Sequence, residues 1–217
     1  MRSVSAFVGM ALAGALWSGP GMAGDNNVAI LLQVATGSLG NTLSIDQSGA
    51  SGSLLAGDLL GATPAMQVGD GNRAAVVVTG TEGSAALMQG SQLTPAIGNS
   101  AEVTVAGIGG TAALQQFGAG NIAELDVLST GAASGSVLQI GSLNDARLRV
   151  EGGNVSGRLV QIGNANTNDL TVGGPGAQDI SVTFTQIGAG LNNSGAQVFT
   201  NAGAVQITQT QFGTFRN

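Results

Sequence analysis

A short motif recurs along this chain: Gln, any residue, Gly, two turn residues and Asn. It occupies 67–72, 116–121, 139–144 and 161–166, and looser copies with one extra residue span 186–192 and 211–217. From position 116 onward, the Gln residues are 23, 22, 25 and 25 positions apart. A nearly fixed period of this length is typical of chains that stack one structural unit on the next. The repeat therefore predicts a stacked architecture.

The residues after each Asn alternate in character. Counting from Asn, positions two, four and six are mostly apolar and never charged, while charges fall on positions one, three and five, as from Asp145 to Val150. This separation with a period of two indicates a strand with one buried face and one wet face. A helix would place those charges on both faces. Two N-terminal units follow the same scheme, after Asn27 (Ala29, Leu31, Gln33) and after Asn41 (Leu43, Ile45, Gln47).

A second strand is expected before each Gln, because these segments are rich in strand-forming residues (112–116, 136–139, 158–161 and 181–186). Gly and Asn after the Gln allow the positive backbone angles of a tight reversal. Each repeat is therefore strand, turn, strand. The predicted fold is an all-β solenoid of about 22–25 residues per rung, with cross-β stacking of the rungs about 4.8 Å apart.

The composition of the N-terminal residues predicts that the chain has two parts, a signal peptide and a repeat domain. Residues 1–23 combine Arg2, an apolar stretch and small residues before Ala23, which predicts a cleaved signal peptide. Residues 24–217 are expected to form a single repeat domain. Two segments, 48–66 and 89–99, break the pattern, and each contains a proline, Pro64 or Pro95. Because proline removes a hydrogen-bond donor from a sheet, we expect bulges or loops there.

The Gln and Asn residues of the motif fall on inward positions, where a polar side chain is normally costly. In a stack with equivalent residues aligned, each side-chain amide can bond to the same amide one rung away, as in cross-β ladders. We therefore predict an inward ladder that serves self-assembly, made of Gln67, Asn72, Gln116, Asn121, Gln139, Asn144, Gln161, Asn166, Gln186 and Asn192.

The charges predict the register of the stack. When the units after Asn121, Asn144 and Asn166 are superposed, Glu124, Arg147 and Asp169 occupy adjacent rungs. Alternating charges favour this alignment modestly. One rung earlier the pattern fails, because Glu102 would lie beside Glu124.

The last strand, expected from Ala204 to Thr210, is followed by a turn but no further strand. Its outer edge would then carry unpaired backbone groups, which invite another chain to add a strand. No charge lies between Ala202 and Phe215 to prevent this. We predict that this exposed end edge, with Val205, Ile207 and Gln209, is a growth surface.

Catalysis is not expected. The chain has no Cys and no His, which removes the usual metal ligands and the Ser–His and Cys–His pairs. No metal and no cofactor are expected. A net charge of −6 argues against nucleic acid as a partner, and no stretch beyond the signal peptide is apolar enough to suggest integral membrane association.

The unit Gln-x-Gly-x-x-Asn-x-Ala, in an exported chain without Cys, resembles the curlin repeat. Curlin proteins are the subunits of curli, the extracellular amyloid fibres of bacterial biofilms. The resemblance implies a subunit that is exported through an outer-membrane pore, meets a nucleator subunit and polymerises with copies of itself at the cell surface. The ten ladder residues named above match the family's inward positions. In contrast to many family repeats, Val usually replaces a second Gln six residues after the Asn.

Two other functions are alternatives for a secreted solenoid, a surface-binding module and a polysaccharide-acting enzyme. A monomeric adhesin or other surface-binding module would recognise a ligand with one flat face. Thr167 and Thr171 hint at the threonine array of an ice-binding face, although Glu124 and Arg147 interrupt it. A polysaccharide-acting enzyme would need clustered charges that the repeats do not offer. Whether a fibre subunit of this kind is major or nucleating stays open.

Overall fold

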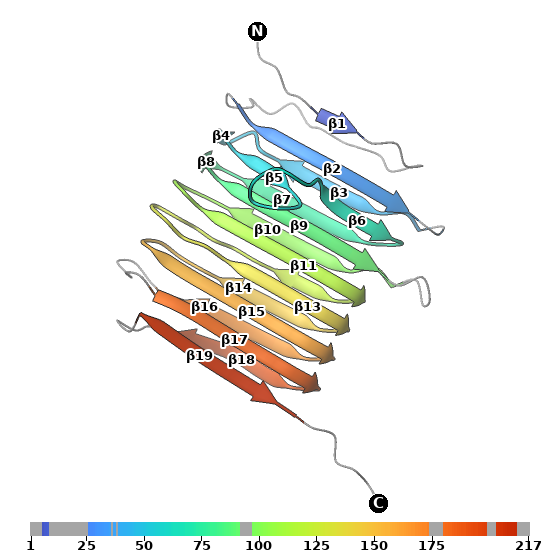
Figure 1. Ribbon diagram of the computed structural model, residues 1–217, viewed down its shortest axis with the longest axis vertical. Helices are drawn as coiled ribbons and strands as arrows, with labels where there is room; N and C mark the ends of the chain where they lie inside the picture. Colours follow the sequence, from blue (N-terminus) through green and yellow to red (C-terminus); the bar gives the residue numbers. More distant parts are fainter. Residues whose placement is uncertain are drawn as a thin grey trace, which may run out of the picture.

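The computed structural model describes residues 6–8, 26–35, 37, 39–91, 97–173, 180–198 and 203–211. The described part of the chain contains strands and no helix. Two layers of parallel strands are stacked along the long axis of the molecule (Figure 1). The prediction of an all-β solenoid is confirmed.

Among the described residues, the first sheet has ten strands, and apart from β1 they lie on the side of the stack that leads into the turns. In chain order they are β1 (Ala6–Val8), β2 (Val28–Ala35), β5 (Leu54–Ala56), β6 (Ala65–Gly69), β9 (Ser84–Ser91), β11 (Thr111–Ala119), β13 (Ser136–Ser142), β15 (Val155–Asn164), β17 (Ile180–Ala189) and β19 (Ala204–Thr210).

The second sheet has seven strands in the described part of the chain, and they follow the turns. They are β3 (Thr42–Asp46), β7 (Arg73–Val78), β10 (Ser100–Val105), β12 (Ile122–Glu124), β14 (Asp145–Arg149), β16 (Thr167–Val172) and β18 (Asn192–Val198). A small third sheet pairs β4 (Ala50–Ser51) with β8 (Gly80–Thr81). Each of these two strands lies between a second-sheet strand and the next first-sheet strand in the chain.

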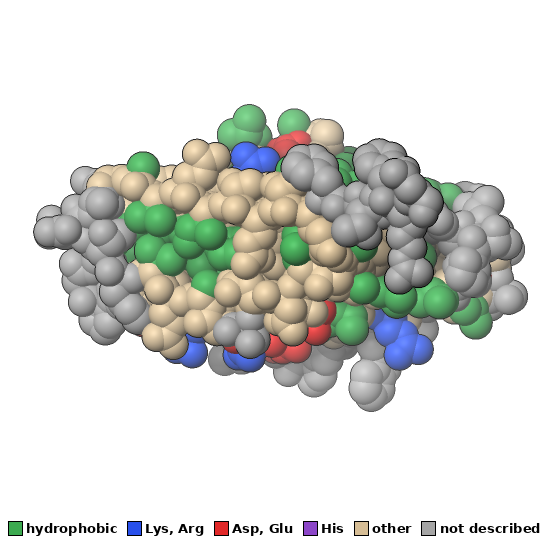
Figure 2. Space-filling view, turned by 90° about the horizontal axis from the view of Figure 1, so that it is seen from below, with side chains coloured by type: hydrophobic (Ala, Val, Ile, Leu, Met, Phe, Trp, Pro, Cys, Tyr) green, Lys and Arg blue, Asp and Glu red, His purple; other side chains and the backbone are tan. Residues whose placement is uncertain are grey.

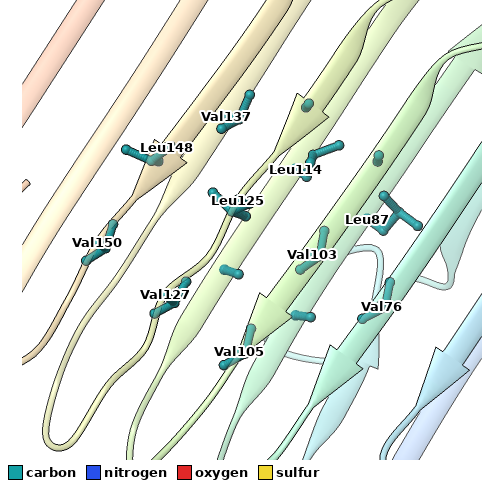
Figure 3. Packing of buried hydrophobic residues seen from close by; sticks show 14 of the residues in the cluster. Val76, Leu87, Val103, Val105, Leu114, Leu125, Val127, Val137, Leu148 and Val150 are labelled. Atoms are coloured by element: carbon teal, nitrogen blue, oxygen red, sulfur yellow. The ribbon is translucent and has the colours of Figure 1, made fainter. Parts of the chain in front are cut away.

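The core lies between the two sheets. Leu114 and Val137 from the first sheet meet Leu125 and Leu148 from the second-sheet side, and all four are almost completely buried (Figure 3). The same inward positions are filled in rung after rung, which forms one continuous apolar cluster. Because neither sheet alone could bury its inner face, the stack as a whole supplies the hydrophobic stabilisation.

The pairing confirms the register that the charges predicted. Glu124 lies beside Arg147, and Arg147 lies beside Asp169. Glu102 lies beside Glu124, as the sequence also predicted. An ion pair joins Arg147 Nη2 to Glu124 Oε1 at 3.3 Å.

The first N-terminal unit differs from its sequence-based assignment. The segment after Asn27 was expected to follow a turn, but it is β2 of the first sheet, where Gln33 aligns with Gln67. Only the segment after Asn41 belongs to the second sheet. The alternation of apolar residues is the same in both sheets, so the pattern alone could not distinguish them.

The two irregular segments have different structures. Within 48–66, β5 and β6 occupy one level between β2 and β9, and residues 57–64 loop out between them. A break at this segment was predicted. Within 89–99, however, Gln89 to Ser91 continue β9 in register with β11. Residues 92–96 of that predicted insertion, with Pro95, lie outside the described residues, while 97–99 are described.

The C-terminal repeat also differs from the prediction. Gln209, rather than Gln211, aligns with Gln186, so the last step is shorter than the motif suggested. Asn217 and the rest of that looser copy lie outside the described residues, as does most of the predicted signal peptide. No helix in the described part of the chain has the length and apolar character needed to cross a bilayer.

Candidate functional site: two amide ladders and the end strands

A continuous row of glutamine side chains runs through the first sheet. Each Nε2 donates to the Oε1 of the glutamine on the next rung, as from Gln116 to Gln139 at 2.8 Å and from Gln139 to Gln161 at 2.9 Å. We call this row the glutamine ladder, and its members are Gln33, Gln67, Gln89, Gln116, Gln139, Gln161, Gln186 and Gln209. Every donor points toward the C-terminal end, so the ladder has a direction.

A second bond fixes that direction. The other Nε2 hydrogen goes to a backbone carbonyl at the start of a second-sheet strand, as from Gln139 to Ile122 at 2.8 Å and from Gln161 to Asp145 at 2.9 Å. Rotating the Gln139 amide by 180° would turn its oxygen toward that carbonyl and break three bonds, to Ile122, Gln161 and Gln116. The glutamine side chains therefore join the two sheets as well as successive rungs.

A row of asparagine side chains occupies the turns. Both the backbone N and the Nδ2 of Asn144 donate to Asn121 Oδ1, at 3.1 and 3.0 Å, and Asn166 makes the same two bonds to Asn144. We call this row the asparagine ladder, and its members are Asn41, Asn72, Asn99, Asn121, Asn144 and Asn166. Its amide-to-amide bonds donate toward the N-terminal end, opposite to those of the glutamine ladder.

The motif glycine completes the asparagine bonds. Asn144 Nδ2 also donates to the carbonyl of Gly163 on the following rung, at 2.9 Å. A Cβ added at Gly141 would overlap that same Gly163 carbonyl, and Gly141 has a φ of 121°. Only glycine allows this close approach at a positive φ. The fixed distance between Gln, Gly and Asn in the motif therefore has a structural reason.

All but one of the predicted inward residues lie in these two ladders. The exception is Asn192, whose side chain is exposed and whose backbone aligns with Thr167. Leu191 takes the ladder position, and its backbone N donates to Asn166 Oδ1 at 3.1 Å. The extra residue in that turn shifts the motif, and a bulge in β18 restores the register by Ala196.

Five ladder members were missing from the predicted inward set: Gln33, Gln89, Gln209, Asn41 and Asn99. Gln89 and Asn99 lack the motif spacing because the segment between them is longer. A search for inward Gln at the end of each apolar alternation would have found the missing glutamines. Ser91 replaces the motif glycine there, and Asn72 Nδ2 donates to the Ser91 hydroxyl at 3.1 Å instead.

Both ends of the glutamine ladder are incomplete within the described residues. The Oε1 of Gln33 receives no described donor, and the Nε2 of Gln209 reaches no described acceptor, whereas Gln209 Oε1 accepts from Gln186 at 2.9 Å. One end therefore presents an acceptor and the other a donor. The two ends are complementary.

The C-terminal end strand, β19, pairs with β17 alone among the described strands. Its side chains alternate, with Val205, Ile207 and Gln209 half-buried and pointing inward, and with Gln206 and Thr208 exposed. No described strand pairs with its outer backbone edge. The predicted end edge therefore consists of strand backbone, and the three predicted side chains extend the core and the ladder.

The N-terminal end strand, β2, is partly covered. Ala6, Phe7 and Val8 of β1 pair with Ala29, Ile30 and Leu31, while no described strand covers the remainder of that edge. β1 falls within the predicted signal peptide. Removal of residues 1–23 would therefore leave no described strand on that edge of β2.

The described residues offer little conventional site chemistry. They contain no group of three or more acidic side chains placed to hold a metal ion. Asp58 in the 57–64 loop accepts hydrogen bonds from the Thr63 hydroxyl and from the backbone N of Ala62, Leu60 and Thr63, which lower its pKa from 3.8 to about 2. These bonds close the loop on itself.

The charges distinguish the outer faces of the two sheets. Viewed from below Figure 1, acidic and basic side chains lie mainly along one long margin of the molecule (Figure 2). Most charged strand residues are in the second sheet. In the described strands of the first sheet, Arg158 is the one charged residue.

Comparisons of the chain with protein-family models, with curated proteins and with solved structures found no match.

Proposed function

We propose that this protein is the structural subunit of an extracellular fibre in which copies stack end to end. The observation that carries the proposal is the directional glutamine ladder, which presents an unpaired Oε1 on Gln33 and an unpaired Nε2 on Gln209 within the described residues. A second copy placed on the end of the first would let Gln209 donate to Gln33. The ladder would then run from copy to copy without interruption.

The apolar side chains of the two end strands support the same register. Aligning Gln209 with Gln33 places Ile207 opposite Leu31 and Val205 opposite Ala29. All four apolar side chains are only partly buried and pack against the hydrophobic core. An added copy would cover them, which removes apolar surface from water and stabilises the join.

The direction of the ladder favours head-to-tail growth. Two C-terminal ends facing each other would oppose two amide donors, and two N-terminal ends would oppose two carbonyl oxygens. A flip that relieved either clash would break the bond of the end amide to its own neighbour, Gln33 to Gln67 or Gln186 to Gln209. The fibre is therefore polar, and β19 of one copy adds to β2 of the next.

In this proposal, the protein is exported with residues 1–23 as a signal peptide, and their removal uncovers the β2 edge. Assembly outside the cell agrees with a chain that has no cysteine and gains its stability from stacking. The curlin-like motif supports a curli-like amyloid in a biofilm matrix, with an export pore and a nucleator subunit as partners. No cofactor and no catalytic step are involved.

The test uses residues 24–217 purified in denaturant and then diluted into buffer. We expect unbranched fibres by negative-stain electron microscopy, with diffraction spacings near 4.8 and 10 Å. A chain that folds to a stable monomer and never forms fibres would contradict the proposal. It would favour the alternative of a monomeric surface-binding module.

A further inference from the structure

An apolar stripe runs along the outer face of the first sheet, one residue after each ladder glutamine. Its exposed members are Phe117 (38% exposed), Ile140 (41%), Ile162 (36%) and Ile187 (40%). They lie on adjacent strands in strict register. We call this row the outer stripe.

The outer stripe extends toward the N-terminal end. Val34 and Val68 hold the same position beside Gln33 and Gln67, and both are half-buried. Gly90 interrupts the column, but the Phe117 ring lies over it, with Cδ1 3.2 Å from the place of a Gly90 Cβ. The stripe therefore has no polar gap from Val34 to Ile187.

A neighbouring column widens the apolar face. Two residues before the outer stripe, the outward positions include Met66, Met88, Leu138 and Val160, which are half-buried or buried, while Gln115 and Thr185 are the polar members of this column. The one charged residue in the described strands of the first sheet, Arg158, lies three residues before the ladder glutamine of its strand, outside both columns. The outer face of the second sheet, in contrast, carries charges on most of its strands.

We propose that fibres of this protein pair side by side through the outer stripe, so that the partner of each stripe is the stripe of a second fibre. This inference rests on the proposed function. A row of side chains that repeats at every rung fits best against a surface with the same period of about 4.8 Å, and another stack of this chain has that period. Two such faces would pack as in a steric zipper.

The area of the stripe determines whether single copies or only whole fibres can pair. From Val34 to Ile187 the stripe crosses six rung intervals, and with a width near 10 Å it offers only about 300 Å² per copy, against about 800 Å² per partner in a standard stable interface. Two monomers are therefore too weakly matched to pair. In a fibre, successive copies hold their stripes in line, and the contacts add without a new association cost for each copy.

The second sheet does not offer a competing surface. Its outward strand residues include Asp46, Glu102, Glu124, Asp145 and Asp169 as well as Arg73, Arg147 and Arg149. Face-to-face packing of two such surfaces would desolvate these charges, and acidic residues would meet acidic residues. The outer face of the second sheet is therefore more stable when it is exposed to solvent.

The test compares fibres of residues 24–217 with those of the double variant Ile140→Thr and Ile162→Thr. Both substitutions keep a β-branched side chain on an outward position and leave the core unchanged. The matched control, Val77→Thr and Ile122→Thr, makes the same kind of change on the outer face of the second sheet, where Ile122 is 53% exposed. Mass per length by dark-field electron microscopy and seeded elongation rate are measured for all three.

We expect paired fibres from the unchanged chain, half that mass per length from the stripe variant, and paired fibres from the control. Seeded elongation should differ by less than about twofold, because exposed substitutions change stability little. Single fibres from the unchanged chain, or paired fibres from the stripe variant, would overturn the lateral inference alone. Absence of fibres from the unchanged chain would instead contradict the proposed function, and the lateral inference with it.

Discussion

Gln139 is bonded to Gln161 by a side-chain amide contact of 2.9 Å that is completely enclosed between the two sheets. The Arg147–Glu124 ion pair joins neighbouring rungs of the same stack, but its side chains are 47% and 41% exposed. Both contacts link residues of adjacent repeats. Burial makes the amide contact the stronger constraint, because an unpaired polar group inside costs more than an unpaired charge in water.

This difference gives the first prediction. Changing Gln139 and Gln161 to Ala should slow seeded fibre growth and lower resistance to guanidinium, because it leaves buried partners unpaired at about 1–3 kcal/mol per group. Changing Arg147 and Glu124 to Ala should cost only about 0–1 kcal/mol. Growth rates by dye binding and dissolution midpoints compare the two double variants. Equal effects would contradict the structural role of the inward glutamines.

The second prediction concerns the motif glycine. Gly141→Ala should prevent or strongly slow assembly, since a Cβ there overlaps the Gly163 carbonyl and the backbone has a positive φ. Strained backbone of this kind costs about 1–3 kcal/mol before the overlap is counted. Gly203→Ala is the control, because no atom of the described residues lies within 4 Å of a Cβ at Gly203 and its φ is not positive. Circular dichroism of refolded samples and fibre yield measure both, and an intact Gly141→Ala solenoid would refute the close-approach argument.

The third prediction concerns the C-terminal edge. Replacing Val205, Ile207 and Gln209 with Lys, Pro and Lys should stop elongation at that end, because charge and a missing donor prevent strand addition. Gln206→Ser and Thr208→Ser are the control, since both side chains are exposed on the same strand. Seeded elongation by dye binding reports the effect. Because every head-to-tail junction contains β19, elongation at the unmodified rate would contradict a junction between β19 and β2.

The fourth prediction concerns pH. The folded pKa of Asp58 is about 2, below its ordinary value of 3.8, mainly because the Thr63 hydroxyl donates to it. A lowered folded pKa means that the carboxylate stabilises the closed 57–64 loop fully above pH 3.8, and that this stabilisation is lost as the pH falls toward 2. Hydrogen exchange at the amides of Leu60, Ala62 and Thr63 should accelerate across that range. In Asp58→Asn, exchange should be fast already at neutral pH and, after correction for intrinsic rates, should not respond to pH below 4; an unchanged pH response would contradict the assignment.

The sequence alone predicted the strands, their inward faces and most of their register. Apolar residues such as Leu148 alternate with charged residues such as Arg147 along one strand. This alternation can be read locally, because a strand turns each side chain to the opposite face from its neighbours. The motif spacing then placed Gln139 and Asn144 inside, and the repeated spacing aligned them with Gln161 and Asn166. These inferences needed no knowledge of distant contacts.

Tertiary structure decided the points where the local pattern had two solutions. β2 joins the first sheet although its alternation fits either sheet, because Gln33 can extend the glutamine ladder only there. Gln209 replaces Gln211, and Leu191 replaces Asn192, because neighbouring rungs impose their alignment on an irregular turn. The direction of the ladder likewise depends on a second amide bond to another strand, which no single repeat contains. Repetition within the sequence determined the unit of the stack, and contacts between units determined how the units align and what each end presents.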